Sequence, residues 1–221
     1  MASKNPQLER ILQARDTPVR ITVGYLKGGT GKSTTSTMLA LALARHSKER
    51  VMLVDADGVN GTSFEWSELA GDEWPAQISV NYWPSINLAK RIRESEHAGH
   101  IVVDTGPSDA AVLRQALNVT DYLVTPMAAS PAEAARVQPT LEAAAEVAIA
   151  HPIELSVLFT RTKPNTVSLR DAKEALAQHV TVLETDVPFL LLYSQAYGTI
   201  PDDLGVYPQV LAEILEGTEN A

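Results

Sequence analysis

Residues 20–46 read RITVGYLKGGTGKSTTSTMLALALARH, and this stretch decides the fold. Its first seven residues are a short apolar, β-branched run that predicts a buried strand, and residues 32–46 have the spacing and length of a helix. The turn between them is rich in glycine, with Gly28, Gly29 and Gly31. Small residues let backbone N–H groups point inward, and a helix N-terminus attracts anions. The stretch therefore predicts a strand, a phosphate-binding loop and a helix in direct succession.

The rest of the chain repeats this alternation of short apolar runs and longer helical segments. Further strands are predicted at 51–55, 78–82, 101–104, 122–125, 155–160 and 180–185, and helices at 85–96, 109–117, 131–150, 167–179 and 208–215. This rhythm indicates a doubly wound, mostly parallel α/β sheet. Such sheets bind ligands beyond the carboxyl ends of their strands. Three of those ends carry chemically useful residues, at 27–34, 55–57 and 104.

Composition narrows the class of protein. A chain of 221 residues with 45% hydrophobic side chains is long enough for one full core. The absence of cysteine excludes disulfides and thiolate metal sites, and no apolar stretch approaches the roughly 18 to 20 residues of a membrane span. We expect a single domain at 19–221 after an N-terminal extension at 1–18, located in the cytoplasm with no membrane contact.

The glycine-rich loop carries the strongest chemical signal. It reads Lys27-Gly28-Gly29-Thr30-Gly31-Lys32-Ser33-Thr34, one residue short of the general G-x-x-x-x-G-K-[ST] pattern because Leu26 stands where that pattern has glycine. Lys32 is expected to reach the terminal phosphates of a nucleotide, and Ser33 to bind Mg²⁺. A glycine-rich turn can also serve packing alone, an alternative that the full pattern disfavours.

Lys27 is a second lysine at the mouth of this loop, and Lys-Gly-Gly-x-Gly-Lys-Ser resembles the deviant Walker A motif of the ParA/MinD family of ATPases. The resemblance implies a P-loop NTPase with ATP or ADP and Mg²⁺ as cofactors. It also implies an ATP-driven sandwich dimer in which Lys27 reaches the partner's nucleotide. Its expected catalytic residues are Lys27, Lys32 and Asp57, and its expected nucleotide contacts are Gly28, Gly29, Thr30, Gly31, Lys32, Ser33, Thr34 and Pro188.

Three carboxylates follow predicted strands. Asp55 and Asp57 end one strand and Asp104 ends another, and the resemblance places Asp55, Asp57, Asp104 and Ser33 around the metal, with Asp57 tied to hydrolysis. Mg²⁺ prefers oxygen ligands and keeps several waters. Ordinary acidic turns remain the alternative for these residues. The family commonly continues Asp-Pro-Gln after the second acid, whereas this chain continues with residues 58–61 as GVNG.

The resemblance also implies a biological role. The chain is similar to the short ParA ATPases that lack an N-terminal helix-turn-helix domain. Those ATPases act in plasmid or chromosome partition, associate with the nucleoid through nonspecific DNA and are stimulated by a ParB-type partner. A MinD-like spatial regulator is an alternative, but it needs a basic C-terminal helix and residues 208–221 contain no Lys or Arg. An ATP-dependent amide ligase of related fold and a nucleotide-gated binding module with little turnover are further alternatives.

The net charge of −9 means that DNA binding requires a local basic patch. Residues 189–193 are apolar where relatives carry arginines. Two clusters of basic residues elsewhere are candidates to bind DNA in place of those arginines, one around a loop and helix and the other on another helix. A solvated helix face is the simpler explanation for each cluster. The first cluster is Arg161, Lys163, Arg170 and Lys173, and the second is Lys90, Arg91 and Arg93.

Overall fold

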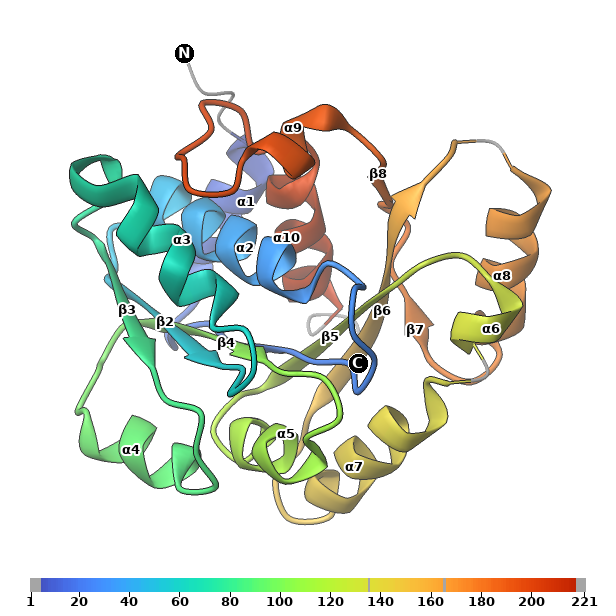
Figure 1. The fold of residues 1–221 in the computed structure, drawn as a ribbon, viewed down its shortest axis with the longest axis horizontal. Coiled ribbons are helices and arrows are strands. Elements are labelled where there is room, and N and C mark those ends of the chain that lie inside the picture. The colour runs from blue at the N-terminus through green and yellow to red at the C-terminus, as the bar shows by residue number, and fades with distance from the viewer. Residues whose placement is uncertain (1–4, 135, 165, 218–221) are drawn as a thin grey trace.

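The computed structural model describes residues 5–134, 136–164 and 166–217. Its centre is an eight-stranded sheet in the order β3-β2-β4-β1-β5-β6-β7, with β8 paired to β6 (Figure 1). All pairings among the described strands are parallel, which confirms the predicted sheet. The strands are β1 (Arg20–Val23), β2 (Val51–Ala56), β3 (Ile78–Tyr82), β4 (His100–Thr105), β5 (Tyr122–Met127), β6 (Glu154–Thr162), β7 (Thr181–Val182) and β8 (Val187–Pro188).

Helices cover both faces of the sheet. One face carries α1 (Pro6–Ala14), α2 (Lys32–His46), α3 (Thr62–Ala70) and α10 (Tyr207–Glu216), with the short α9 (Leu191–Gln195) beside them (Figure 1). The other carries α4 (Leu88–Glu94), α5 (Ala110–Leu117) and α7 (Gln138–Ala148), while α6 (Pro131–Ala134) and α8 (Val167–Ala177) lie towards the β7 edge. A 3₁₀ turn, η1 (Gly71–Glu73), follows α3. None of the described helices has the length and apolar character needed to cross a bilayer.

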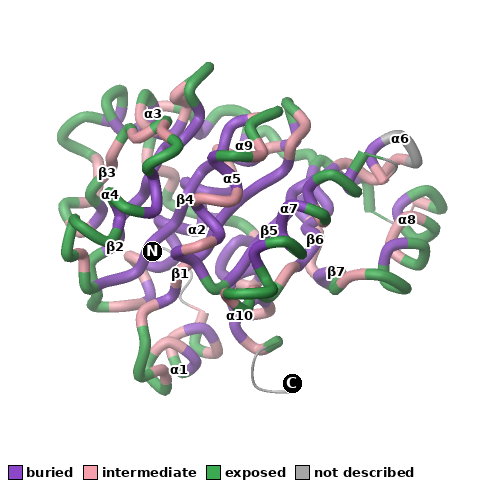
Figure 2. Tube along the Cα trace, turned by 90° about the horizontal axis from the view of Figure 1, so that it is seen from below, coloured by how far each residue is buried: buried purple, intermediate pink, exposed green. Residues whose placement is uncertain are grey.

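The core consists of apolar layers on the two sides of the sheet, and Figure 2 shows the strands as its most buried part. Side chains alternate along each strand, so Val51 and Leu53 of β2 pack towards α2 and α10, whereas Met52 and Val54 pack towards α4 and α5. Burial on both faces explains why these strands read as continuous apolar runs. The same packing holds the carboxyl ends of β1, β2 and β4 together at one edge of the sheet.

Three α-helices of the described residues were not predicted from the sequence: α1, α3 and the short α9. Residues 6–14, assigned above to an extension, form α1, which packs against α10 and α2 with Leu8 and Ile11 in the core. Asn5 caps this helix by accepting hydrogen bonds from the backbone N–H groups of its first turn, and Pro6 follows as a favourable first residue. The second unpredicted helix, α3, buries Trp66 and follows directly on the loop after Asp57.

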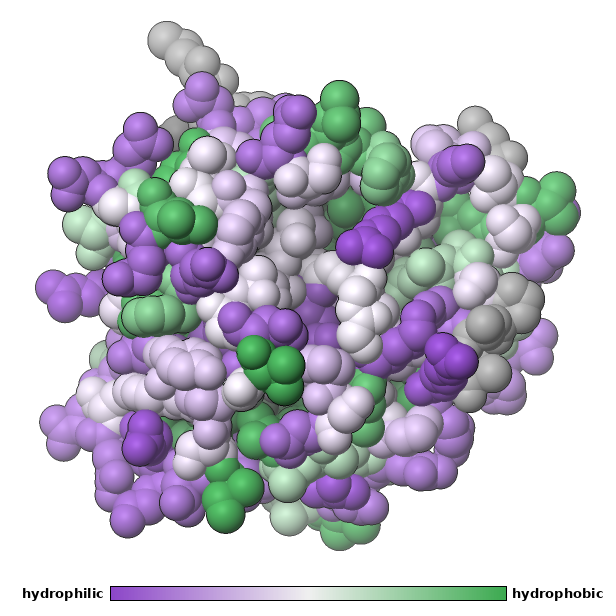
Figure 3. All heavy atoms as spheres, viewed as in Figure 1, coloured by the Kyte–Doolittle hydropathy of each residue, from purple (hydrophilic) through white to green (hydrophobic). Residues whose placement is uncertain are grey.

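Two other segments differ from the prediction. The helix predicted at 131–150 is divided into α6 and α7, and Pro139 at the start of α7 explains the break because proline cannot continue a preceding helix. No strand or helix was predicted over the apolar run 189–193, and its residues 191–193 begin α9. Phe189 and Leu191 are 65% and 68% exposed, whereas Tyr193 is buried in the core. The run therefore has one exposed side, and Figure 3 shows apolar side chains gathered over α9.

Candidate functional site

The phosphate loop connects β1 to the first turn of α2. Gly29 and Gly31 have φ values of 75° and 89°, a backbone conformation that favours glycine. Lys32 is only 7% exposed, and its Nζ donates to the backbone carbonyl of Lys27 at 2.9 Å. Burial lowers the pKa of Lys32, and the nearby charges of Asp104 and Asp57 oppose that shift. The loop therefore holds a buried lysine at the positive end of a helix, which is an arrangement suited to phosphate.

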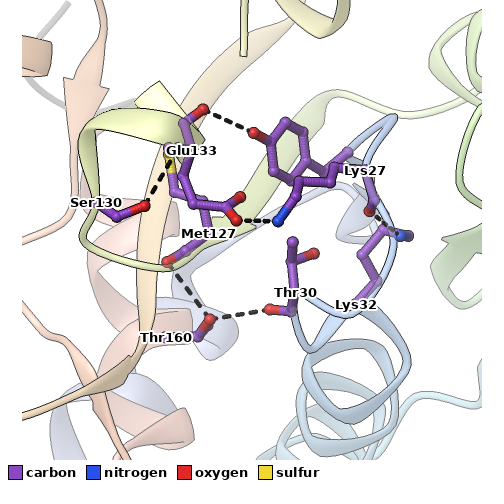
Figure 4. Close-up of polar contacts among 8 residues, drawn as sticks. Lys27, Thr30, Lys32, Met127, Ser130, Glu133 and Thr160 are labelled. Atoms are coloured by element: carbon purple, nitrogen blue, oxygen red, sulfur yellow. Dashed lines mark hydrogen bonds and ion pairs between the residues drawn. The ribbon is translucent and has the colours of Figure 1, made fainter. Parts of the chain in front are cut away.

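A side chain of β6 makes a hydrogen bond to the phosphate loop. Thr160 Oγ1 donates to the backbone carbonyl of Thr30 at 2.9 Å, which ties the loop to the sheet (Figure 4). The Thr30 hydroxyl is buried and has no hydrogen-bond partner among the described residues. An unpartnered hydroxyl in a polar loop is a position where a ligand oxygen can bind.

Lys27 is paired within its own chain. Its Nζ forms an ion pair with the carboxylate of Glu133 in α6, and the two side chains point at each other in Figure 4. The Glu133 backbone carbonyl accepts a hydrogen bond from the Tyr25 hydroxyl at 2.8 Å. Burial and the charge of Glu133 raise the pKa of Tyr25 to about 12. Sequence reasoning missed Glu133, because nothing local to residues 130–134 indicates a partner more than a hundred positions away.

Asp104 lies at the carboxyl end of β4 and is fully buried. Ser63, in the first turn of α3, donates to Asp104 Oδ2 at 2.7 Å, and Oδ1 has no partner among the described residues. Burial raises the pKa of Asp104 to about 7, with a smaller contribution from the charge of Asp55. The nearby hydroxyl groups of Ser63 and Ser33 oppose this shift. A buried carboxylate with one unsatisfied oxygen beside Ser33 fits a hydrated Mg²⁺ ion.

Asp55, at the end of β2, fastens the loop that follows it. Its Oδ1 accepts from the backbone N–H of Asp57 and its Oδ2 from that of Phe64, both at 3.0 Å. Burial raises the pKa of Asp55, and these hydrogen bonds oppose the shift. The residue expected near the metal therefore also closes the 57–64 segment into a defined loop.

Asp57 lies inside that loop and is 5% exposed. Its Oδ1 accepts from the backbone N–H groups of Val59 and Asn60, and its Oδ2 from the Asn60 side chain. Gly106, in the loop after β4, lies against it: a Cβ atom there would be 2.8 Å from Asp57 Oδ1. The glycine at position 106 thus permits the close approach of the two loops.

A small cavity of about 140 Å³ opens beside the start of α2. It is lined by Gly31, Thr34, Thr160 and Pro188, together with aromatic and apolar groups of the β8–α9 segment such as Tyr193. Its position next to the phosphate loop and its flat, partly apolar walls suit a nucleobase. Of the sequence-predicted nucleotide contacts, Gly31, Thr34 and Pro188 line this cavity.

Acidic residues of the same chain lie beside several cations of the two predicted basic clusters. In the first, Lys173 forms an ion pair with Asp186 at 3.0 Å, and Arg170 lies 3.5 Å from Asp171. Arg161 and Lys163 are exposed at the end of β6. In the second cluster, Lys90 lies 3.6 Å from Glu94. Several of these cations are therefore partly neutralised by acids of the same chain.

A glycine-rich loop, a buried lysine at a helix N-terminus and acids at the neighbouring strand ends define a P-loop nucleotide-binding protein. Among the described residues, no group of three or more His, Asp or Glu side chains could hold a metal ion alone.

The chain belongs to the CobQ/CobB/MinD/ParA nucleotide-binding domain family, whose model matches residues 21–202. A relative from Gloeobacter kilaueensis, described as maintenance of carboxysome distribution protein A, is 33% identical over 172 residues, which cover 77% of this chain and 74% of the relative.

Solved structures share the fold. Cobyrinic acid a,c-diamide synthase from Mycobacterium smegmatis with bound ADP and magnesium has a TM-score of 0.70 at 16% identity, covering 92% of this chain and 96% of that one. Apo McdA from Cyanothece has a TM-score of 0.68 at 19% identity, covering 91% and 98%. The family and the P-loop fold expected from Lys27–Ser33 are thus confirmed.

Proposed function

We propose that the protein is a Mg²⁺-dependent ATPase of the ParA type, in which ATP closes two copies into a dimer and hydrolysis opens it. The observation that carries this proposal is the pair of lysines on one phosphate loop. Lys32 is buried beside Asp104 and Asp57, and Lys27, at the mouth of the loop, is paired with Glu133. Glu133 supplies the counter-charge of Lys27 in this structure, and Lys27 needs another anion when it leaves Glu133. A nucleotide triphosphate supplies that anion.

Each residue then has a chemical role. Lys32 and the backbone N–H groups of residues 28–34 bind the phosphates and stabilise the charge that develops on the transferred group. Ser33 and Asp104 hold Mg²⁺, which supplies charge neutralisation to the phosphates when bound. Asp57 accepts a hydrogen bond from the attacking water and so orients it. Lys27 leaves Glu133 and contacts the nucleotide of the partner copy.

The proposal also covers DNA binding and the cargo, which is the structure that the protein positions in the cell. A solved structure of the same fold, pNOB8 ParA, is described as bound to nonspecific DNA, with a TM-score of 0.58 at 15% identity. We propose that the ATP-bound dimer binds nonspecific DNA and that a ParB-type or functionally similar partner stimulates hydrolysis. The name of the curated relative favours a protein compartment as the cargo over a plasmid or chromosome.

The test is size-exclusion chromatography with light scattering, in ADP and in a slowly hydrolysed ATP analogue with Mg²⁺, with and without a DNA fragment. We expect a monomer with ADP and a dimer with the analogue that elutes together with DNA. Lys32→Ala should abolish nucleotide binding, while Lys27→Ala should bind ATP and remain monomeric. A wild-type protein that stays monomeric with the analogue would exclude the ATP-driven dimer, and Lys32→Ala with normal ATP turnover would exclude the assigned site.

The cargo needs a separate experiment in cells. Removal of the protein should disturb the spacing of its cargo without changing the cargo's amount. Clustered compartments with stably inherited replicons would support the compartment proposal, whereas loss of a replicon from the population would support partition.

A further inference from the structure

The loop after β2 contains an exposed asparagine, Asn60, whose side chain turns back onto the acid that begins the loop. Its Nδ2 donates to Asp57 Oδ2 at 2.9 Å. A carboxylate can only accept, so the amide must present its NH₂ group to Asp57. Gly61 follows with a φ of 60°, and a Cβ at that position would lie 3.2 Å from the Tyr82 ring. The glycine thus allows the chain to turn sharply and keeps Asn60 over Asp57.

The other contacts of Asp57 leave its carboxylate little freedom. Oδ1 accepts two backbone N–H groups, those of Val59 at 2.9 Å and Asn60 at 3.2 Å, which fill its acceptor capacity. Gly106 lies against the same oxygen. The backbone donors are available whatever side chain occupies position 60, so the Asn60 amide is the contact on Oδ2 that depends on this sequence.

This arrangement leaves Oδ2 with one acceptor direction for a further donor, because a carboxylate oxygen accepts about two hydrogen bonds and the Asn60 amide takes one. A carboxylate that orients water is more effective when its plane is fixed before the reaction. Without the amide, Oδ2 can accept from solvent in several directions, and the carboxylate can rotate about its Cβ–Cγ bond.

We propose that Asn60 is a positioning residue for hydrolysis, which fixes the Asp57 carboxylate and leaves one direction on Oδ2 for the attacking water. The inference rests on the proposed ATPase function and deepens it. It also gives a role to residues 58–61, where this chain departs from the Asp-Pro-Gln continuation common in its family. Asn60 contacts neither nucleotide nor metal in this account and acts only through Asp57.

The experiment compares steady-state ATP hydrolysis by full-length wild type, Asn60→Ala and Asn60→Asp. Loss of a hydrogen bond to a charged group should lower kcat about 10-fold in Asn60→Ala while KM changes less than about 2-fold. Asn60→Asp has the same shape but places a like charge against Asp57, so we expect a larger loss, about 100-fold. Both variants should keep the wild-type melting temperature, since the side chain is exposed.

Asn118→Ala is the matched control. The Asn118 amide makes a hydrogen bond of the same kind, from Nδ2 to the Arg114 carbonyl at 2.7 Å, at the end of α5. This variant should retain wild-type kcat. ATP-dependent dimerisation, measured by light scattering, should be unchanged in both Asn60 variants, because their nucleotide contacts are intact.

The outcomes separate this inference from the proposed function. Normal wild-type hydrolysis with an unchanged or increased kcat in Asn60→Ala would overturn the role of Asn60 and leave the ATPase proposal standing. An Asn60→Asp protein as active as the wild type would show that the amide's donor is irrelevant. A wild-type protein that binds ATP without turnover would overturn both.

Discussion

Asp104→Asn should make the metal-free protein more stable at neutral and alkaline pH. Burial raises the pKa of Asp104 from 3.8 to about 7, so the folded state holds this proton more tightly than the unfolded state. Between these two values Asp104 is protonated in more of the folded molecules than of the unfolded ones, and its contribution to stability therefore falls as pH rises from about 4 to about 7. Asparagine removes the charge and still offers a carbonyl oxygen to the Ser63 hydroxyl.

The size of the effect follows from the shift. Each pKa unit corresponds to about 1.4 kcal/mol, so a shift of about three units gives a stabilisation on the order of 4 kcal/mol at pH 8. The difference between the two proteins should shrink through pH 7 and vanish near pH 4, where the carboxyl group is protonated in both states. Since the shift is set by desolvation in a buried site, little screening by salt is expected.

The assay is urea denaturation in EDTA at several pH values, for wild type, Asp104→Asn and the control Asp72→Asn, whose carboxylate is exposed in η1. With Mg²⁺ and an ATP analogue the order should reverse, because ligand binding stabilises the wild type and not the variant. An Asp104→Asn protein that is no more stable than wild type at pH 8 in EDTA, or a gain independent of pH, would refute the reasoning.

Three further predictions follow from other parts of the structure. Gly106→Ala places a Cβ 2.8 Å from Asp57 Oδ1, so it should displace that carboxylate and lower kcat about 10-fold or more; steady-state kinetics that match wild type would contradict the close approach. Leu8→Ala, at a fully buried site of α1, should cost about 2 to 5 kcal/mol in chemical denaturation, whereas Arg10→Ala on the exposed face of the same helix should cost less than about 0.5 kcal/mol; equal effects would mean that α1 does not contribute to the core. Burial lowers the pKa of His100 from 6.5 to about 4, so its contribution to stability should rise with pH between those values as the ring becomes neutral in the unfolded state as well; His100→Gln should remove this contribution from the pH profile of stability, and an NMR titration that places the pKa of the ring near 6.5 would be inconsistent with it.

Local sequence was sufficient to predict the phosphate loop and the strands of the sheet. The loop's function depends on consecutive small residues followed by Lys32 and Ser33, and the strands are buried on both faces, so each is an uninterrupted apolar run. The ends of β2 and β4 could therefore be placed beside the loop, with Asp55, Asp57 and Asp104. The helix α1 was missed although Asn5 and Pro6 are a recognisable start, because its polar face gives the segment the composition of a solvated extension.

Residues outside these motifs make the contacts that hold the charged side chains of the site in place. Glu133 pairs with Lys27 across 106 positions, and Ser63 reaches Asp104 across 41. Neither contact has a local pattern, because each depends on how a loop or helix crosses the carboxyl edge of the sheet. The same edge brings Gly106 against Asp57.

The sequence by itself determined the fold class, the family and the position of the glycine-rich loop, because each of these is encoded in residue patterns along short segments of the chain. Only the tertiary structure decided which groups hold Lys27, Asp57 and Asp104 in place and how burial shifts the pKa of Asp104. The physical reason is that desolvation and long-range hydrogen bonds depend on which surfaces pack together, and packing is a property of the whole chain.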